Sequence, residues 1–280
     1  MTLRAGPGDD HAERGAEIVR ERTDLVPRVA VVTGSGLGAA LAEVKPEAEI
    51  AYAELPGLVA PTVPGHAGRL VVGTFAGVPV LVLFGRQHFY EGHPMSVVSL
   101  PVRLAAALGA EALVATASVG GLDPALEPGQ LVVGEDHINM MGGDPLLGWR
   151  ARDGAAVFVD PSAGYVPAWQ DLAVAAAGEA GLPVSRGVYL AVSGPSYETR
   201  AEAEHMRRAG GTVVGMSVVP EVVAAAALEM RGLGLYCVTN MVGPGTNHEE
   251  VTAVAAGFAP KLAEVLRRVL PAIGEELASV

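Results

Sequence analysis

A chain of 280 residues in which half are hydrophobic and only 18% are charged can bury a sizeable core, which excludes intrinsic disorder. Its formal net charge of −12, with Lys45 and Lys261 as its only lysines, argues against a nucleic-acid binder, since such a protein needs a basic face. The single cysteine excludes an internal disulfide, and no apolar stretch approaches the roughly 20 residues that cross a bilayer. We therefore expect a cytoplasmic protein that has no membrane or nucleic-acid partner.

Short β-branched runs alternate with alanine-rich stretches along the whole chain. The expected strands are Val29–Thr33, Arg69–Phe75, Val80–Phe84, Ala112–Ala117, Leu131–Glu135, Arg186–Val192, Thr212–Gly215 and Leu235–Thr239. The expected helices cover residues 11–22, 36–43, 96–108, 168–180, 199–209, 221–231 and 249–270. This alternation is typical of an α/β fold with a largely parallel central sheet, in which ligands bind beyond the strand ends. Because no composition shift marks a boundary, we expect one domain over residues 1–280, opened by a helical segment within residues 1–25.

The first expected strand runs into a glycine-rich loop, Gly34–Ala39. The loop fits the loose dinucleotide-binding fingerprint, and Glu54 lies at about the spacing of the acid that binds the ribose. Glycines between a strand and a helix equally form a pocket in which backbone amides and the Ser35 hydroxyl hold an anion. A dinucleotide, a phosphate and a structural turn are thus all open for this loop. A third glycine-rich strand end, Thr116–Gly121, either adds backbone amides to the same anion or forms a tight turn.

A polar segment follows the strand that ends at Phe84. In an extended backbone its residues Arg86, His88 and Tyr90 project to the same side, because side chains alternate along a strand. A planar bidentate donor, an imidazole and a phenol together suit a phosphate or a sugar. The alternative is a polar strand end at which Arg86 pairs with Glu91 on the surface.

A zinc site built from His66, His88 and His93 is the metal alternative for this region. No acidic residue or cysteine accompanies these histidines at the spacing of metal ligands, so we expect no metal site. Cys237, in the middle of an expected strand, is interpreted as a small buried residue and not as a nucleophile.

Six short motifs occur in order along the chain. They are Gly34-Ser35-Gly36-Leu37-Gly38, Val63-Pro64-Gly65-His66-Ala67-Gly68, Gly85-Arg86-Gln87-His88-Phe89-Tyr90-Glu91-Gly92, Gly194-Pro195-Ser196-Tyr197-Glu198-Thr199, Gly215-Met216-Ser217 and Thr239-Asn240, and His248-Glu249-Glu250-Val251 follows them. With this ordered set the chain resembles the trimeric purine nucleoside phosphorylases over nearly its whole length after residue 25. The resemblance implies an α/β fold with a mixed central sheet flanked by helices, a homotrimer, and a reaction that needs no metal or organic cofactor.

The resemblance also implies roles for individual residues. Phosphate would be bound by Ser35, His66, Arg86, His88, Ser118 and Ser217. The nucleoside would be bound by Tyr90, Tyr197, Glu198, Met216, Asn240 and His248. Catalysis would rest on His88, Glu198 and Asn240. The implied reaction is phosphorolysis of 6-oxopurine nucleosides such as inosine and guanosine, with phosphate as co-substrate, to the free base and (deoxy)ribose 1-phosphate.

Structural interpretations stand beside these roles. An acid such as Glu198 is favourable near a helix N-terminus without any ligand, and Asn240 can close a turn. Ser217 can cap the helix that begins near Pro220, and Met216 can fill the core. For the whole protein, the alternatives are a nicotinamide-dependent oxidoreductase, which rests on the Gly34–Ala39 loop alone, and a non-catalytic nucleoside-binding protein.

Overall fold

The computed structural model describes residues 3–4, 9–63, 66–151, 153–243 and 247–279. The strands of its main sheet are β2 (Val29–Val32), β3 (Lys45–Ala51), β4 (Arg69–Phe75), β5 (Val78–Phe84), β6 (Ala112–Gly121), β7 (Leu131–Met140), β9 (Val184–Val192), β10 (Val213–Gly215) and β11 (Arg231–Met241). Within the described ranges these strands form one sheet in the order β10-β9-β7-β11-β6-β2-β5-β4-β3. A separate short pair joins β1 (Leu3–Arg4) to β8 (Arg150–Ala151).

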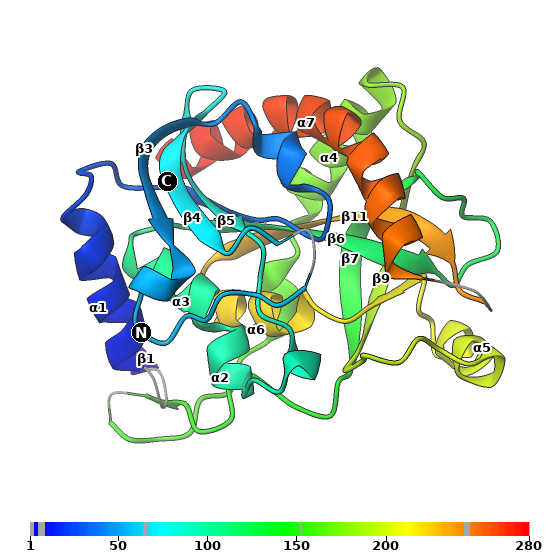
Figure 1. Cartoon of the computed structure of the whole chain (residues 1–280), viewed down its shortest axis with the longest axis horizontal. Helices are drawn as coiled ribbons and strands as arrows, with labels where there is room; N and C mark the ends of the chain where they lie inside the picture. The colour runs from blue at the N-terminus through cyan, green and yellow to red at the C-terminus, as the bar shows by residue number, and fades with distance from the viewer. Residues whose placement is uncertain (1–2, 5–8, 64–65, 152, 244–246, 280) are drawn as a thin grey trace.

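Helices cover both faces of this sheet (Figure 1). They are α1 (Asp9–Arg20), α2 (Met95–Val98), α3 (Leu100–Ala107), α4 (Pro167–Glu179), α5 (Arg200–Arg208), α6 (Val219–Ala227) and α7 (His248–Ala278), with the short 3₁₀ turns η1 (Gly38–Leu41), η2 (Tyr52–Glu54), η3 (Phe89–Glu91) and η4 (Pro161–Gly164). Of the helices in the described ranges, none has the length and hydropathy that a bilayer span requires.

The central strands are apolar at consecutive positions because both of their faces are buried. In β2, Val29 and Val31 belong to the core cluster that includes α4 and α7, whereas Ala30 and Val32 belong to the cluster that includes α1, α3 and α6. The helices of the two clusters lie on opposite sides of the sheet in Figure 1. The mixed α/β architecture with helices on both faces is therefore confirmed.

The sheet is less parallel than the alternation of elements suggested. β5, β2, β6 and β11 run parallel to one another, but β7 is antiparallel to β11, and β9 and β10 follow the direction of β7. The hairpin of β4 and β5 and the edge strand β3 are antiparallel as well. β10 also pairs with the end of β6, with Val214 opposite Gly120. This second pairing brings the residues after β10 to the carboxyl end of β6.

Several expected elements have different bounds in the structure. β6, β7 and β11 are longer than predicted, since their outer halves find partners in strands remote in sequence. The helix expected over 96–108 is divided at Ser99 into α2 and α3. The helix expected over 36–43 is only the 3₁₀ turn η1.

Strand β3 has no counterpart among the expected strands. It is an edge strand in which Ala48 and Ile50 are buried, while Lys45, Glu47 and Glu49 face water. Charged residues are common on sheet edges because they discourage pairing with another chain. The same charges and Pro46 interrupt the apolar pattern by which a strand is predicted from sequence.

Candidate active site

A cavity lies where the segments that follow β2, β5 and β10 meet the ends of β6 and β11. It is lined by Ser35, Arg86, His88, Ser118 and Ser217 from the expected phosphate group, and by Tyr90, Tyr197, Glu198, Met216, Asn240 and His248 from the expected nucleoside group. Of the expected site residues, all of which lie in the described ranges, only His66 is absent from this lining. Residues as far apart in the chain as Ser35 and His248 thus converge on one cavity.

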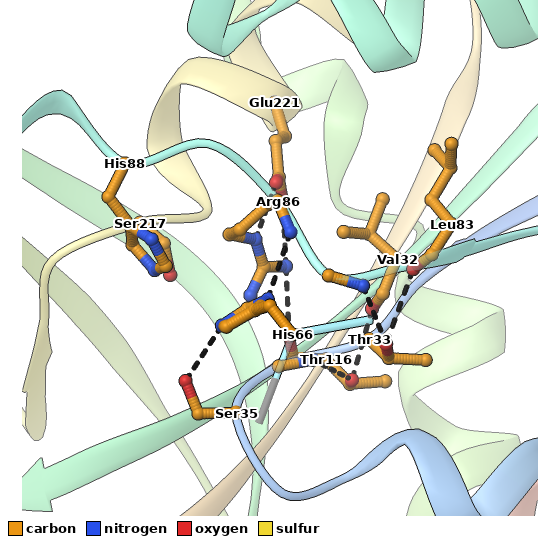
Figure 2. A network of polar contacts seen from close by, with 12 residues as sticks. Val32, Thr33, Ser35, His66, Leu83, Arg86, His88, Thr116, Ser217 and Glu221 are labelled. Atoms are coloured by element: carbon orange, nitrogen blue, oxygen red, sulfur yellow. Dashed lines mark hydrogen bonds and ion pairs between the residues drawn. The ribbon is translucent and has the colours of Figure 1, made fainter. Parts of the chain in front are cut away.

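Arg86 is held by an acid that the sequence gave no reason to select. Its Nε donates to Glu221 Oε1 at 2.6 Å, and its Nη2 donates to Glu221 Oε2 and to the carbonyl of Thr116 at 3.0 and 2.9 Å (Figure 2). Both charged side chains are almost completely buried. Burial opposes the charge of Arg86, but the paired carboxylate of Glu221 outweighs this and raises the pKa of the arginine. No described residue bonds Nη1, which leaves that nitrogen for a ligand in the cavity.

The surface pair of Arg86 with Glu91, which was the structural alternative, is not present. Glu91 instead accepts hydrogen bonds from the backbone and hydroxyl of Thr62, at 2.9 and 2.7 Å, and from the backbone of His88 at 2.7 Å. Partial burial works against ionisation, yet the bonds from His88 and Thr62 hold the pKa of Glu91 well below its usual value. The charged carboxylate lies 3.4 Å from His88 Nδ1.

His88 is buried and its ring stacks on that of Tyr90, with 4.7 Å between the centroids. The segment does not stay extended, because Tyr90 lies in the turn η3, but both side chains still line the cavity. Burial lowers the pKa of His88, and the nearby Arg86 charge acts in the same direction, while Glu91 opposes both. An anion in the cavity would favour the protonated imidazole and so offset the cost of burial.

His66 acts on Ser35 from outside the cavity lining. The backbone N–H of Arg86 donates to His66 Nδ1 at 3.0 Å, and His66 Nε2 lies 2.8 Å from Ser35 Oγ (Figure 2). Burial, with the neighbouring His88 and Arg86, lowers the pKa of His66 to about 3, so the ring is neutral and its one proton sits on Nε2. Ser35 Oγ therefore accepts from His66, which leaves the serine proton free for an anion. Pro64 and Gly65, in the same motif, lie outside the described residues.

Two threonines, Thr33 directly after β2 and Thr116 within β6, fix the backbone around the glycine loop. The Gly34 amide donates to Thr116 Oγ1 and the Gly85 amide donates to Thr33 Oγ1, both at 3.1 Å. Ser118 Oγ also donates to the carbonyl of Ser35 at 2.9 Å. These bonds bring the first and third glycine-rich strand ends together, as the anion interpretation of both requires.

The structure does not support a dinucleotide site at this loop, because Glu54, the expected ribose-binding acid, lies elsewhere. Glu54 accepts from the backbone of Ala51 at 3.0 Å and lies 3.5 Å from Arg22, and it does not line the cavity. The loop also leads into a single 3₁₀ turn, not into an α-helix whose N-terminus would hold a pyrophosphate.

Glu198 and Asn240 line the same cavity. Glu198 precedes the Thr199 cap of α5, and burial raises the pKa of its carboxyl group. In β11 the register with β6 shifts between Val238 and Asn240, and both Thr239 and Asn240 line the cavity. Asn240 Nδ2 donates to the carbonyl of Met241 at 3.3 Å, which identifies the amide NH₂ as the donor. The Thr239 hydroxyl lies 3.0 Å from Asn240 Oδ1 and 3.2 Å from the carbonyl of Val119. Tyr197 beside them is 44% exposed.

The structural role expected for Ser217 is wrong, and the one expected for Cys237 is confirmed. Ser217 does not cap α6, because the residue before that helix is Val218 and no side-chain cap bond is present there. Cys237 is buried, as expected, and burial raises the pKa of its thiol to about 12.

His248 is the first residue of α7, and residues 244–246 between it and Asn240 lie outside the described residues.

Comparison with known proteins agrees with this geometry. A family model described as "Phosphorylase superfamily" matches residues 28–271. Purine nucleoside phosphorylase 1 of Bacillus subtilis is 41% identical over 257 residues, which cover 89% of this chain and 95% of that protein. Among solved structures, a Schistosoma purine nucleoside phosphorylase in complex with hypoxanthine superimposes with a TM-score of 0.84 at 33% identity, covering 93% of this chain and 96% of that one. A Schistosoma complex with guanosine gives 0.83 at 32% identity, with the same coverage.

Proposed function

This chain belongs to the phosphorylase superfamily and, within it, to the purine nucleoside phosphorylases, and we propose on that premise that it cleaves inosine and guanosine with inorganic phosphate. As a pentosyltransferase of this kind, it releases the free purine and forms ribose 1-phosphate. The observation that carries the choice of substrate is that the residues expected to bind phosphate and those expected to bind the purine line one cavity.

The residues assigned to phosphate would align it as the nucleophile. Arg86 Nη1, the Ser35 and Ser217 hydroxyls and protonated His88 supply donors for its oxygens, and charge-assisted bonds of this kind are the strong ones. A phosphate oxygen forms the new bond to C1′ of the sugar while the bond from C1′ to the purine nitrogen breaks. The cationic character that develops on the sugar is stabilised by the anion beneath it.

The residues assigned to the purine would stabilise it as the leaving group. The electron pair of the broken bond moves into the imidazole ring of the purine, and the Asn240 NH₂ group can donate to N7 as charge builds there. The Glu198 carboxylate can accept from N1–H of a 6-oxopurine, a proton that adenine lacks. Bonds that strengthen in the transition state raise kcat and not only affinity. Tyr90, Met216 and His248 line the same cavity, and we assign the ribose to them.

The decisive experiment is incubation of the protein with inosine, with and without phosphate, and measurement of hypoxanthine. Release that depends on phosphate, with ribose 1-phosphate formed in equal amount, supports the proposal. Binding of inosine without release would instead indicate a nucleoside-binding protein. A change in nicotinamide absorbance with a substrate would indicate an oxidoreductase.

We also propose that the protein needs no cofactor beyond its co-substrate and that it forms a homotrimer, as the resemblance implies. Light scattering coupled to size-exclusion chromatography measures the mass directly. A mass near three times 28.6 kDa supports the trimer, and a mass of 28.6 kDa contradicts it. The cytoplasmic location expected from the sequence stays a prediction.

A further inference from the structure

A buried tyrosine on β9 contacts Ser217, one of the three serines that line the cavity. The hydroxyl oxygen of Tyr189 accepts the backbone N–H of Ser217 at 3.2 Å and lies 3.4 Å from Ser217 Oγ. Tyr189 is fully buried and does not line the cavity, whereas Ser217 does. The tyrosine therefore reaches the cavity only through the serine.

The direction of the bond between the two hydroxyls follows from the proton of the phenol. Burial raises the pKa of Tyr189 to about 12, so the phenol keeps its proton at neutral pH. A buried hydroxyl proton without an acceptor is costly, and the contacts of this hydroxyl within the described residues all go to Ser217. The amide of Ser217 can only donate, so Oγ is the acceptor. The proton of Ser217 is then free to point into the cavity.

The glycine of the Gly-Met-Ser motif makes room for this contact. A Cβ atom at Gly215 would lie 2.1 Å from the Tyr189 hydroxyl oxygen and 2.7 Å from its Cζ, both closer than real Cβ atoms come. The same arrangement recurs at Ser35, the partner of His66, where a Cβ atom at Gly85 would lie 2.6 Å from His66 Nδ1. At Ser217 and at Ser35, the neighbouring ring therefore fits only because the adjacent backbone position is a glycine, which has no Cβ atom.

We propose that Tyr189 is a positioning residue of the anion site, which donates to Ser217 Oγ and so turns the serine proton toward bound phosphate. It is the counterpart of His66 at Ser35, and the two rings together set the hydroxyls of Ser35 and Ser217 as donors. This inference rests on the proposed function, since the anion that it serves is the phosphate of that reaction.

The test compares Tyr189→Phe with Tyr236→Phe. Tyr236 is as buried as Tyr189, and the centroids of the two rings lie 4.9 Å apart. Its hydroxyl forms no hydrogen bond with Ser217, so Tyr236→Phe is a matched control. Loss of one neutral hydrogen bond should raise the phosphate KM of Tyr189→Phe by about three- to tenfold. The inosine KM should stay at the parental value, and Tyr236→Phe should match the parent in both. A parental phosphate KM in Tyr189→Phe overturns the proposal.

A double-mutant cycle separates positioning from a merely structural role. Ser217→Ala removes the group through which Tyr189 acts, so adding Tyr189→Phe to it should cause no further rise in the phosphate KM. If the two losses multiply instead, Tyr189 acts by another route and the proposal fails. If Tyr189→Phe folds poorly, Gly215→Ala displaces the hydroxyl without removing it and should raise the phosphate KM as well, and a parental value there contradicts the proposal.

Failure of the proposed function would be visible separately. In that case the parent releases no hypoxanthine with phosphate, and all variants are equally inactive. Calorimetric titration with inorganic phosphate then measures the same cycle without turnover. Weaker phosphate binding in Tyr189→Phe but not in Tyr236→Phe still supports the positioning role, and equal binding in both overturns it.

Discussion

Arg86 and Glu221 form an ion pair from which water is almost completely excluded, with side chains 2% and 4% exposed. Such a pair contributes little net stability over an apolar pair of the same volume, but breaking it leaves one charge buried and unpaired. Its two parallel bonds fix the plane of the guanidinium and so fix where Nη1 points. We interpret Glu221 as the residue that orients Arg86 toward the anion.

Glu221→Gln should therefore lower both stability and phosphate use. We expect a loss of about 3–5 kcal/mol in the free energy of unfolding, because the Arg86 charge stays buried without its partner. Urea titration measures this loss, and the phosphate KM measures the change in orientation. Glu43→Gln breaks the exposed pair with Arg267 and should cost less than about 1 kcal/mol. Equal costs for the two variants would contradict the role given to Glu221.

Asn240 and Glu198 together should decide which purine is accepted. Adenosine would place the N1 lone pair against the Glu198 carboxylate, and sites built on such bonds discriminate by factors of about 10⁴ or more. Asn240→Asp should reduce the preference for inosine over adenosine by about tenfold or more, since a protonated aspartic acid donates to N7 and an ionised one accepts from the 6-amino group. The ratio of kcat/KM for the two nucleosides measures this. Equal proportional loss of both substrates in the variant would contradict it.

At the scale of elements, the site depends on how closely helix α7 packs on the glycine loop. A Cβ atom at Gly36 would lie 2.8 Å from Ala255 Cβ and 3.0 Å from the Thr252 carbonyl, and Gly36 has a φ of +76°. The loop that presents Ser35 thus sits against the first turns of a 31-residue helix. A shift of this helix would move Ser35 as well.

Gly36→Ala tests this packing, with Gly77→Ala as its control. Gly77 also has a positive φ, of +85°, but an added Cβ there meets nothing within 4 Å. Both variants carry the backbone strain of about 1–2 kcal/mol, and only Gly36→Ala adds overpacking of about 1–3 kcal/mol. We expect a larger loss of unfolding free energy and a higher phosphate KM in Gly36→Ala alone. The same phosphate KM in both variants would show that the packing of α7 on the glycine loop does not affect phosphate binding.

For the whole molecule, the buried imidazoles couple stability to pH. Burial lowers the pKa of His66 from 6.5 to about 3, and it lowers that of His88 as well. In the unfolded chain each imidazole binds a proton below about pH 6.5, whereas in the folded protein it does so only at a lower pH. The unfolded state therefore binds more protons in this window, and the free energy of unfolding falls as the pH decreases through it.

Urea unfolding at a series of pH values between 7 and 4 measures this dependence. His66→Gln keeps an amide that can donate to Ser35 but removes the titrating group, so its stability should fall less steeply with decreasing pH than that of the parent. Parallel curves for the two proteins would show that His66 is not held neutral in the folded state.

The sequence by itself determined the elements and motifs whose pattern is local. The strand Arg69–Phe75 has both of its predicted bounds, because the apolar run that defines it ends where the strand ends. The ordered glycine, histidine and arginine motifs indicated the family and eleven of the residues that line the cavity, since each motif is a short local run that needs no distant partner to be noticed.

Only the tertiary structure decided which residues stand behind that lining. Glu221 lies 135 positions from Arg86, and Tyr189 lies in an apolar strand 28 positions from Ser217, so neither has a local signal. The outer halves of β6 and β11 and the edge strand β3 depend in the same way on pairing with remote segments. The physical reason is that burial, ion pairing and strand pairing are properties of two segments at once, whereas a sequence pattern describes one.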